Sequence, residues 1–167
     1  MEIKSDVILD HTQIQHIIRR IAYQIYEANA DESEVLLAGI YENGYVFAQK
    51  IKKVLEKISP LQVNLCKVNL DKKQPINSVT SELDPVDFEN KSIVVIDDVL
   101  HSGSTLIYGV NYFLQVPLKK IKTGVLIDRS HKQFPIKADF KGISLSTSLN
   151  ENVRVIFEKN NDRAALE

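Results

Sequence analysis

The sequence has little cysteine, glycine or proline. Its 167 residues include one cysteine, Cys66, together with six glycines and five prolines. A single cysteine excludes an internal disulfide, and no spacing of Cys and His residues fits a zinc site. No Gly-, Pro- or Ser-rich tract marks a linker, and no internal repeat is found. We therefore expect a single domain over residues 1–167.

Long apolar runs and an excess of one charge are also missing. No stretch approaches the length of a membrane span, and the first residues lack a basic segment followed by an apolar run. We therefore expect a cytoplasmic protein without membrane contact. The formal net charge is -1, which argues against a broad basic nucleic-acid surface, although a local basic patch stays open. Apolar residues make up 44% of the chain, enough for a globular core.

Residues 93–105 carry the clearest local pattern. The apolar run 93–96 predicts a strand buried on both faces, which Asp97 and Asp98 are expected to end. The apolar-rich run 106–114 predicts a helix that ends before Pro117. Between strand and helix lies a short polar loop of small residues around one glycine: His101, Ser102, Gly103, Ser104 and Thr105.

A tight loop between a strand and a helix N-terminus is typical of a phosphate site. Backbone N–H groups and the helix dipole converge on one point there, and the hydroxyl side chains of the loop can add donors. Gly103 allows a ligand to approach the backbone closely. Asp97 and Asp98 stand just before the loop, where they can bind vicinal hydroxyls or a metal-bound ligand. The pattern indicates a sugar-phosphate site; the simpler alternative is that these residues only cap a strand and a helix.

The remaining chain alternates strand and helix patterns in its first half. Residues 10–28 predict an amphipathic helix, with Thr12 and Gln15 as its capping box. Gly44 follows a strand pattern and precedes a helix pattern, so it is either a simple turn residue or part of a ligand loop. The strands expected before the acidic pair are 7–9 at an edge, 34–41 and 61–70, and the second helix is 45–58.

After residue 70 the patterns are shorter. Residues 71–90 predict a loop or hairpin without a long helix, which is either a lid or a plain solvated connection. A tail over residues 158–167 is expected to be frayed. The strands expected in this half, besides that at 93–96, are 121–127, 136–140, 144–148 and 153–157.

Alternating strands and helices predict an α/β fold with a mostly parallel sheet. Right-handed crossovers place ligands at the carboxyl ends of the strands. Three loops should meet at that edge, namely residues 41–44, residues 101–105 and the segment from Asp128 onward. The order of the strands in the sheet cannot be derived from these patterns.

The run 94–105 resembles the phosphoribosyl pyrophosphate signature of type I phosphoribosyltransferases, which is an apolar strand, two acids and a short Ser/Thr–Gly loop. Residues 37–40 with Gly44 resemble the pyrophosphate loop of that family. Residues 125–132 and 135–142 resemble one branch, the pyrimidine-operon attenuation regulators that double as uracil phosphoribosyltransferases. The resemblance covers most of residues 8–157, apart from 67–90. It implies the type I phosphoribosyltransferase fold with a short hood or lid at about 67–90.

The resemblance also implies roles for particular residues. Asp97 and Asp98 would hold the ribose hydroxyls and, through substrate or water, Mg²⁺. Phe140 would be a stacking surface, or alternatively a core aromatic, and Arg129 would contact the base unless it forms only a surface ion pair. The implied sets are His101, Ser102, Gly103, Ser104 and Thr105 for the 5′-phosphate, Tyr41, Glu42, Asn43 and Gly44 for the pyrophosphate, and Arg129, Asp139, Phe140 and Lys141 for the base.

The implied reaction is displacement of pyrophosphate at the anomeric carbon by a base nitrogen, with uracil the expected base. Positive charge develops on the ribose ring as pyrophosphate leaves, so nearby carboxylates stabilise the transition state electrostatically. Mg²⁺ would neutralise and orient the diphosphate. Because members of the family commonly pair their subunits, the resemblance implies a homodimer or a higher homo-oligomer.

The sequence departs from the branch pattern at three places. Asn43, beside Glu42, stands where the branch carries an arginine, and Ser104 stands where it tends to carry another. The tyrosine-arginine-aspartate motif of the lid is missing, and the charged residues near its start are Asp71, Lys72 and Lys73. Two hypotheses follow. One is a phosphoribosyltransferase, and the other is a nucleotide-sensing regulator with little transferase activity, of which an RNA-binding attenuator is one version.

Overall fold

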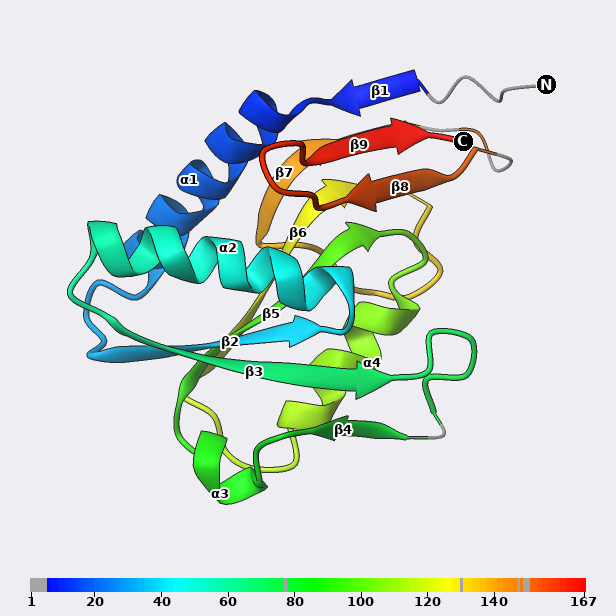
Figure 1. Ribbon diagram of the computed structural model, residues 1–167. Helices are drawn as coiled ribbons and strands as arrows, with labels where there is room; N and C mark the ends of the chain where they lie inside the picture. Colours follow the sequence, from blue (N-terminus) through cyan, green and yellow to red (C-terminus); the bar gives the residue numbers. More distant parts are fainter. Residues whose placement is uncertain (1–5, 77, 130, 147, 149–150) are drawn as a thin grey trace.

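The computed structural model describes residues 6–76, 78–129, 131–146, 148 and 151–167. Within these residues, six strands form the main sheet in the order β4-β3-β2-β5-β6-β7 (Figure 1). All neighbouring strands are parallel except β4, which runs antiparallel to β3. Five carboxyl ends therefore lie at one edge, and the predicted α/β fold is confirmed. The bounds are β2 Glu34–Ile40, β3 Gln62–Leu70, β4 Val79–Ser81, β5 Ser92–Leu100, β6 Lys120–Asp128 and β7 Phe140–Ser144.

Helices cover both faces of this sheet (Figure 1). Helices α1 (His11–Ala28) and α2 (Asn43–Ile58) pack together on one face. Helix α4 (Ser104–Phe113) and the short α3 (Pro85–Phe88) pack on the other. Alternate residues of β2 enter the two cores, since Leu37 packs beneath α1 and α2 whereas Leu36 packs on the α4 side.

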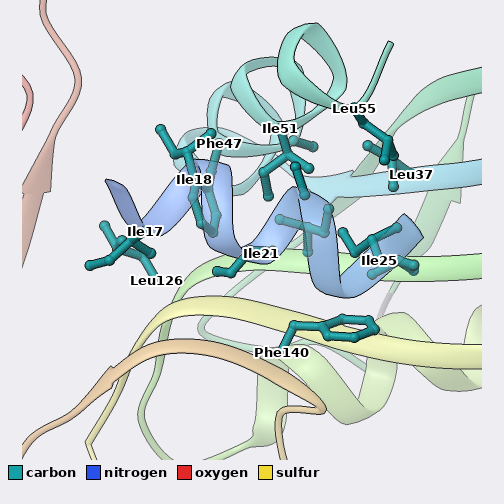
Figure 2. Packing of buried hydrophobic residues seen from close by; sticks show 14 of the residues in the cluster. Ile17, Ile18, Ile21, Ile25, Leu37, Phe47, Ile51, Leu55, Leu126 and Phe140 are labelled. Atoms are coloured by element: carbon teal, nitrogen blue, oxygen red, sulfur yellow. The ribbon is translucent and has the colours of Figure 1, made fainter. Parts of the chain in front are cut away.

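The α1 face of the core contains the apolar stripe that the sequence predicts for the first helix. Figure 2 shows side chains of α1 meeting those of α2 above the sheet. Burying one such aliphatic side chain contributes about 1.5–3 kcal/mol, so this stripe holds both helices on the strands. The residues of this buried cluster that Figure 2 labels are Ile17, Ile18, Ile21 and Ile25 from α1, Phe47, Ile51 and Leu55 from α2, and Leu37, Leu126 and Phe140 from the sheet.

A second sheet joins the two ends of the described chain. Strands β1 (Asp6–Leu9), β9 (Arg163–Leu166) and β8 (Val153–Ile156) pair antiparallel in that order (Figure 1). The expected edge strand at 7–9 is confirmed. The expectation of a frayed tail over 158–167 is wrong, because β9 pairs on both sides and Ala164 is fully buried.

Three other local predictions differ from the structure. The capping box of α1 is formed by Asp10 and Gln13 rather than by Thr12 and Gln15, because the helix already begins at His11. The acidic pair does not end β5, since pairing with β6 continues to Leu100. Helix α4 begins two residues earlier than the apolar run alone suggests.

The strands expected at 136–140 and 144–148 are replaced by the single strand β7. Thr123 explains where it begins, since its hydroxyl donates to the Lys137 carbonyl and accepts from the Asp139 amide, so ladder pairing starts at Phe140. Residue 147 of the second expected strand lies outside the described residues. The described residues of segment 71–90, which leave out residue 77, form only β4 and α3 as regular elements, and this agrees with the predicted loop or hairpin. No helix in the described part of the chain is long and apolar enough to cross a membrane.

Candidate active site

The end of β5, the following loop and the first turn of α4 line one cavity at the carboxyl edge of the main sheet. Its volume is about 370 Å³. The structure thereby brings together the two predicted acids and the whole predicted phosphate loop. The side chains and backbone around it come from Asp97, Asp98, Val99, Leu100, His101, Ser102, Gly103, Ser104, Thr105 and Leu106, with Lys72, Arg129, Asn152 and Val153 closing the sides.

Gly103 sets the shape of the predicted phosphate loop. It is the N-cap of α4 with φ of 88°, a left-handed conformation that favours glycine. A Cβ at this position would meet Ile136 Cγ2 at 2.8 Å. The Gly103 carbonyl accepts the amide of Ile107 at 2.9 Å. The amides of Thr105 and Leu106 precede this first helical bond and so have no acceptor within the helix, which is the kind of donor that binds a phosphate.

Neighbouring backbone holds the loop in place. The Ser104 amide donates to Ser102 Oγ at 3.2 Å. The Ser102 carbonyl accepts the amides of Gln133 and Phe134 at 2.8 and 3.1 Å. The segment after β6 therefore supports the phosphate loop from outside, an arrangement that the sequence patterns did not reveal.

The two carboxylates differ in their surroundings. Asp97 is only 2% exposed, and its Oδ1 accepts the amide of Asp98 at 2.9 Å. Asp98 is half-buried and accepts the Asn43 side-chain amide at 3.1 Å. Burial first, and then the charge of Asp98, raises the pKa of Asp97 well above its usual range. The ammonium of Lys72, 3.6 Å from Asp97 Oδ1, acts in the opposite direction.

The predicted pyrophosphate loop lies beside this cavity. Tyr41, Glu42 and Asn43 line an adjoining hollow of about 310 Å³, which shares Lys72 and Asp98 with the first. The peptide bond between Tyr41 and Glu42 is cis. A hydrogen bond with the Glu42 carboxylate is the largest cause of a raised pKa at the Tyr41 hydroxyl.

Gly44 is more than a turn residue, because it is buried in the first turn of α2 against β5. A Cβ there would lie 2.7 Å from the Ile96 carbonyl oxygen and 2.9 Å from Asp97 Cα. Only a residue without a side chain lets α2 begin this close to the acidic pair. The two sequence segments that resemble one family signature are thereby in direct contact.

Arg129 and His101 also line the cavity, and His131 lies beside His101. Arg129 is 4% exposed and donates from Nη2 to the Glu151 carbonyl at 2.5 Å, so it is not a surface ion pair. The rings of His101 and His131 meet edge to face with centroids 6.1 Å apart. Desolvation, followed by the positive charges of Arg129 and His131, lowers the pKa of His101. His101 is therefore expected to meet a ligand as a neutral imidazole near pH 7.

The other predicted base contacts are placed differently. Phe140 is 7% exposed in the α1 core (Figure 2) and begins β7 opposite Gly124, far along the strand from its carboxyl end at Ser144. Asp139 Oδ2 accepts the Thr123 amide at 3.0 Å. The stacking role does not fit this position, whereas the core-aromatic alternative does. Lys141 reaches Asp128, with 3.9 Å between Nζ and Oδ2, but does not line the cavity.

Asn152 and Val153 were not foreseen as lining residues. They belong to the start of β8 and the segment before it, so they reach the cavity only because the second sheet packs over the carboxyl edge. No local pattern around them suggests a ligand. Asn43 makes the same connection, since its side-chain amide donates both to Asp98 and to the Val155 carbonyl, the latter at 2.9 Å.

Comparisons with known proteins give consistent matches. Residues 4–156 match the family model described as phosphoribosyl transferase domain. A protein named bifunctional protein PyrR from Staphylococcus saprophyticus is 34% identical over 169 residues, with 96% of each chain covered. The protein of that name from Fusobacterium nucleatum is 33% identical, with 95% of this chain and 94% of its own covered.

Solved structures of low sequence identity share the fold. A hypoxanthine phosphoribosyltransferase of Trypanosoma cruzi superposes with a TM-score of 0.76, covering 95% of both chains at 16% identity. A hypoxanthine-guanine phosphoribosyltransferase from Bacillus anthracis gives a TM-score of 0.71, with 84% of this chain and 81% of the other covered at 20% identity. At these identities the match concerns the fold alone.

Proposed function

This chain belongs to the phosphoribosyl transferase domain family, and on that premise we propose that it transfers the ribose 5-phosphate of phosphoribosyl pyrophosphate to uracil and releases pyrophosphate. The observation that carries this proposal is the single cavity lined by both acids and by every residue of the predicted phosphate loop. The adjoining hollow at residues 41–43 supplies room for the leaving diphosphate.

Each part of the site has a chemical task in this reaction. The amides and hydroxyls at the start of α4 bind the 5′-phosphate, aided by the positive end of the helix dipole. Asp97 and Asp98 accept hydrogen bonds from the ribose hydroxyls. As the bond to pyrophosphate lengthens, positive charge on the ribose ring is stabilised by these carboxylates. The base nitrogen attacks the anomeric carbon, and the protein supplies no nucleophile of its own.

The residues present fit a magnesium ion that arrives with the substrate. Among the described residues, no group of three or more His, Cys, Asp and Glu side chains could hold a metal ion. Asp97 and Asp98 offer the oxygen donors that Mg²⁺ prefers, and it commonly binds through one or two carboxylates with substrate phosphates and water. When bound, Mg²⁺ would neutralise charge on the diphosphate.

The base would lie on the Arg129 side of the cavity. Arg129 is buried, lines the cavity and is held by the Glu151 carbonyl, so its position is defined before a ligand binds. Its donors suit the carbonyl oxygens of a pyrimidine. This supports uracil, which the sequence resemblance also implies.

A turnover assay tests the proposal. The purified chain is mixed with phosphoribosyl pyrophosphate, Mg²⁺ and, in separate reactions, uracil, guanine, hypoxanthine, adenine and orotate, and released pyrophosphate is measured. We expect release with uracil above the reaction without a base. Absence of release with all five bases, together with tight binding of a nucleoside monophosphate, would overturn the enzyme assignment.

That outcome would favour the second candidate, a nucleotide-sensing regulator. Its support is the pyrophosphate loop, where Glu42 and Asn43 replace the positive charge expected there, and the relatives whose printed name is bifunctional. The RNA-binding version of this hypothesis requires salt-sensitive binding to a structured RNA that UMP or UTP shifts. A titration at two salt concentrations measures it, and the absence of any binding would exclude RNA attenuation.

The assembly is proposed on the sequence resemblance alone. We propose a homodimer or a higher homo-oligomer. Light scattering on the eluate of a sizing column measures the mass directly, and a mass equal to one 19.0 kDa chain would contradict this proposal.

A further inference from the structure

Lys72 has a distinct position at the candidate pyrophosphate hollow. Among the described residues lining this hollow, which are Tyr41, Glu42, Asn43, Lys72 and Asp98, Lys72 carries the only positive charge. Two carboxylates face the same space. These carboxylates would repel a diphosphate that enters the hollow, unless the positive charge of Lys72 offsets them.

Two neighbouring residues are already engaged elsewhere. The Lys67 ammonium lies over the rings of Tyr41 and Tyr45, at 5.1 and 4.9 Å from their centroids, and Lys67 lines neither cavity. The side-chain amide of Asn43 donates to Asp98 and to the Val155 carbonyl. Lys67 therefore braces the loop, and Asn43 ties it to β8, which leaves Lys72 to meet the ligand.

Lys72 also lines the larger cavity, where its ammonium lies 3.6 Å from Asp97 Oδ1. The side chain of Lys72 is 47% exposed, whereas that of Asp97 is 3% exposed. Lys72 thus approaches the acid from the solvent side, on a flexible stem with rotatable donors. Its ammonium can leave Asp97 without unpacking any core residue, and the hollow that it can enter is immediately adjacent.

From this placement we propose that Lys72 is a ligand-exchange residue: it pairs with Asp97 in the empty site and moves to the diphosphate when the ribose hydroxyls take its place on the acid. The proposal rests on the proposed function, because it requires phosphoribosyl pyrophosphate as the ligand. No covalent bond changes in this exchange. Hydroxyl donors replace the ammonium at the carboxylate, and the ammonium then offsets negative charge on the leaving group.

Comparing two ligands isolates the diphosphate. Ribose 5-phosphate fills the phosphate loop and reaches the acids, whereas phosphoribosyl pyrophosphate adds only the diphosphate. Titration calorimetry with each ligand, in the presence of Mg²⁺, is performed on the wild type, Lys72→Met, Lys72→Arg and Lys73→Met. Lys73 is the matched control, because it is the next lysine in the same loop and lines neither cavity.

We expect Lys72→Met to weaken the binding of phosphoribosyl pyrophosphate by about ten- to a hundredfold, the range of a charge-assisted hydrogen bond. The same variant should bind ribose 5-phosphate as tightly as the wild type, or more tightly, because the hydroxyls no longer displace an ammonium. Lys72→Arg should retain most of the affinity, and Lys73→Met should match the wild type. A melting temperature within a few degrees of wild type shows that each variant is folded.

Two results would overturn the exchange. If Lys72→Met lost the same affinity for both ligands, the lysine would act only through a general charge effect. If it lost affinity for neither, Lys72 would not reach the diphosphate. A different result bears on the function itself: a wild type that binds ribose 5-phosphate but not phosphoribosyl pyrophosphate would overturn the transferase proposal, and the exchange with it.

Discussion

Asp97 combines almost complete burial with a functional position. Asp97 lines the cavity next to Asp98, yet it is only 2% exposed, and the pKa of its carboxyl group is raised mainly by burial. Ionising such a group costs free energy that the folded chain must supply. Lys72 and the amide of Asp98 offset part of that cost. Asp97 is therefore expected to reduce the stability of the folded chain, although it contributes to ligand binding.

The first prediction at this scale concerns Asp97→Asn. A carboxyl whose native pKa lies above the ordinary value of about 3.9 contributes stability that is lost as the pH rises through the native pKa. The variant lacks this loss, so it should be at least as stable as the wild type at pH 8, with a smaller difference at pH 4. Urea denaturation at both pH values measures it. Each unit of pKa shift is worth about 1.4 kcal/mol.

Turnover in Asp97→Asn should fall, even though the stability of the variant does not. Removing one electrostatic stabiliser of this kind lowers kcat by about 10²- to 10³-fold, so Asp97→Asn should lose activity while gaining stability. Asp98→Asn is the matched comparison, since Asp98 is half-buried and accepts the amides of Asn43 and Val99. An Asp97→Asn variant that is less stable than wild type at pH 8, or that keeps full turnover, would contradict this assignment.

A second prediction at this scale concerns Gly44→Ala. The added methyl group meets backbone atoms of Ile96 and Asp97 at less than 3 Å, so α2 or β5 must shift. We expect a loss of about 1–3 kcal/mol in unfolding free energy and weaker ligand binding, because the shift moves Asp97. Chemical denaturation and calorimetry measure the two effects.

Gly109→Ala provides the control for this substitution. Gly109 lies within α4, and the three atoms nearest to a Cβ there are side-chain atoms of Ile40 and Val95, the nearest at 3.2 Å. Alanine favours helix over glycine by up to about 1 kcal/mol. The control should therefore be close to neutral. Equal losses in the two variants would show that the close approach of Gly44 to the backbone of Ile96 and Asp97 is not special.

At the scale of elements, the hairpin of β8 and β9 connects the end of the chain to the site. Asp162 lies in the turn of this hairpin and is fully buried. Its carboxylate accepts from Gln15 of α1 at 2.8 Å and pairs with Lys50 of α2 at 3.1 Å. Phe157 stacks on Phe47 with ring centroids 6.2 Å apart. The hairpin is thereby fastened to both helices on one face of the main sheet.

We predict that Asp162→Ala destabilises the protein by about 3–5 kcal/mol, because Lys50 and Gln15 lose a buried partner. The loss should extend to ligand affinity, since Asn152 and Val153 at the start of this hairpin line the cavity. Glu167→Gln is the control on the same hairpin: its pair with Arg154 is exposed, at 3.2 Å, and should contribute less than about 1 kcal/mol. Thermal unfolding and nucleotide titration of both variants measure these effects. A small loss in Asp162→Ala would show that β9 pairing alone holds the hairpin.

At the scale of the whole molecule, the site is assembled from segments far apart in sequence. Lys72 follows β3, the two acids lie within β5, Arg129 follows β6 and Asn152 precedes β8. A ligand that touches all of these segments stabilises the folded chain over the unfolded one. Ligand binding at this site should therefore raise the thermal stability of the entire protein.

We predict that a nucleoside monophosphate at a hundred times its Kd stabilises the chain by about 2.7 kcal/mol. For a protein of this size that corresponds to a rise of roughly 5–10 °C in Tm. Uracil alone should have a much smaller effect, because it lacks the phosphate and ribose groups that most of the cavity lining would contact. Scanning fluorimetry with UMP, ribose 5-phosphate and uracil measures the rise in Tm that each ligand causes. A larger shift with uracil than with UMP would contradict the assignment of the cavity.

Much of the fold could be predicted because the relevant patterns are local. The α1 stripe and the buried runs of β2, β5 and β6 depend on spacing within one element. The pairing of acids with a small-residue loop is likewise local, and the structure places all seven of these residues around one cavity. Phe140 shows the limit, because its neighbours resemble a base-contacting stretch while the register with Gly124 places it in the core.

The sequence by itself determined the alternation of strands and helices from β1 to β3 and from β5 to β6, the small-residue loop and the acidic pair, since hydrophobic period, glycine and charge act within a few residues. Only the tertiary structure decided that residues 163–166 form a strand between β1 and β8, that Asn43 joins Asp98 to β8, and that Lys72 reaches Asp97. These contacts join residues separated by up to about 160 positions. They depend on strand register and packing, which no short stretch of sequence encodes.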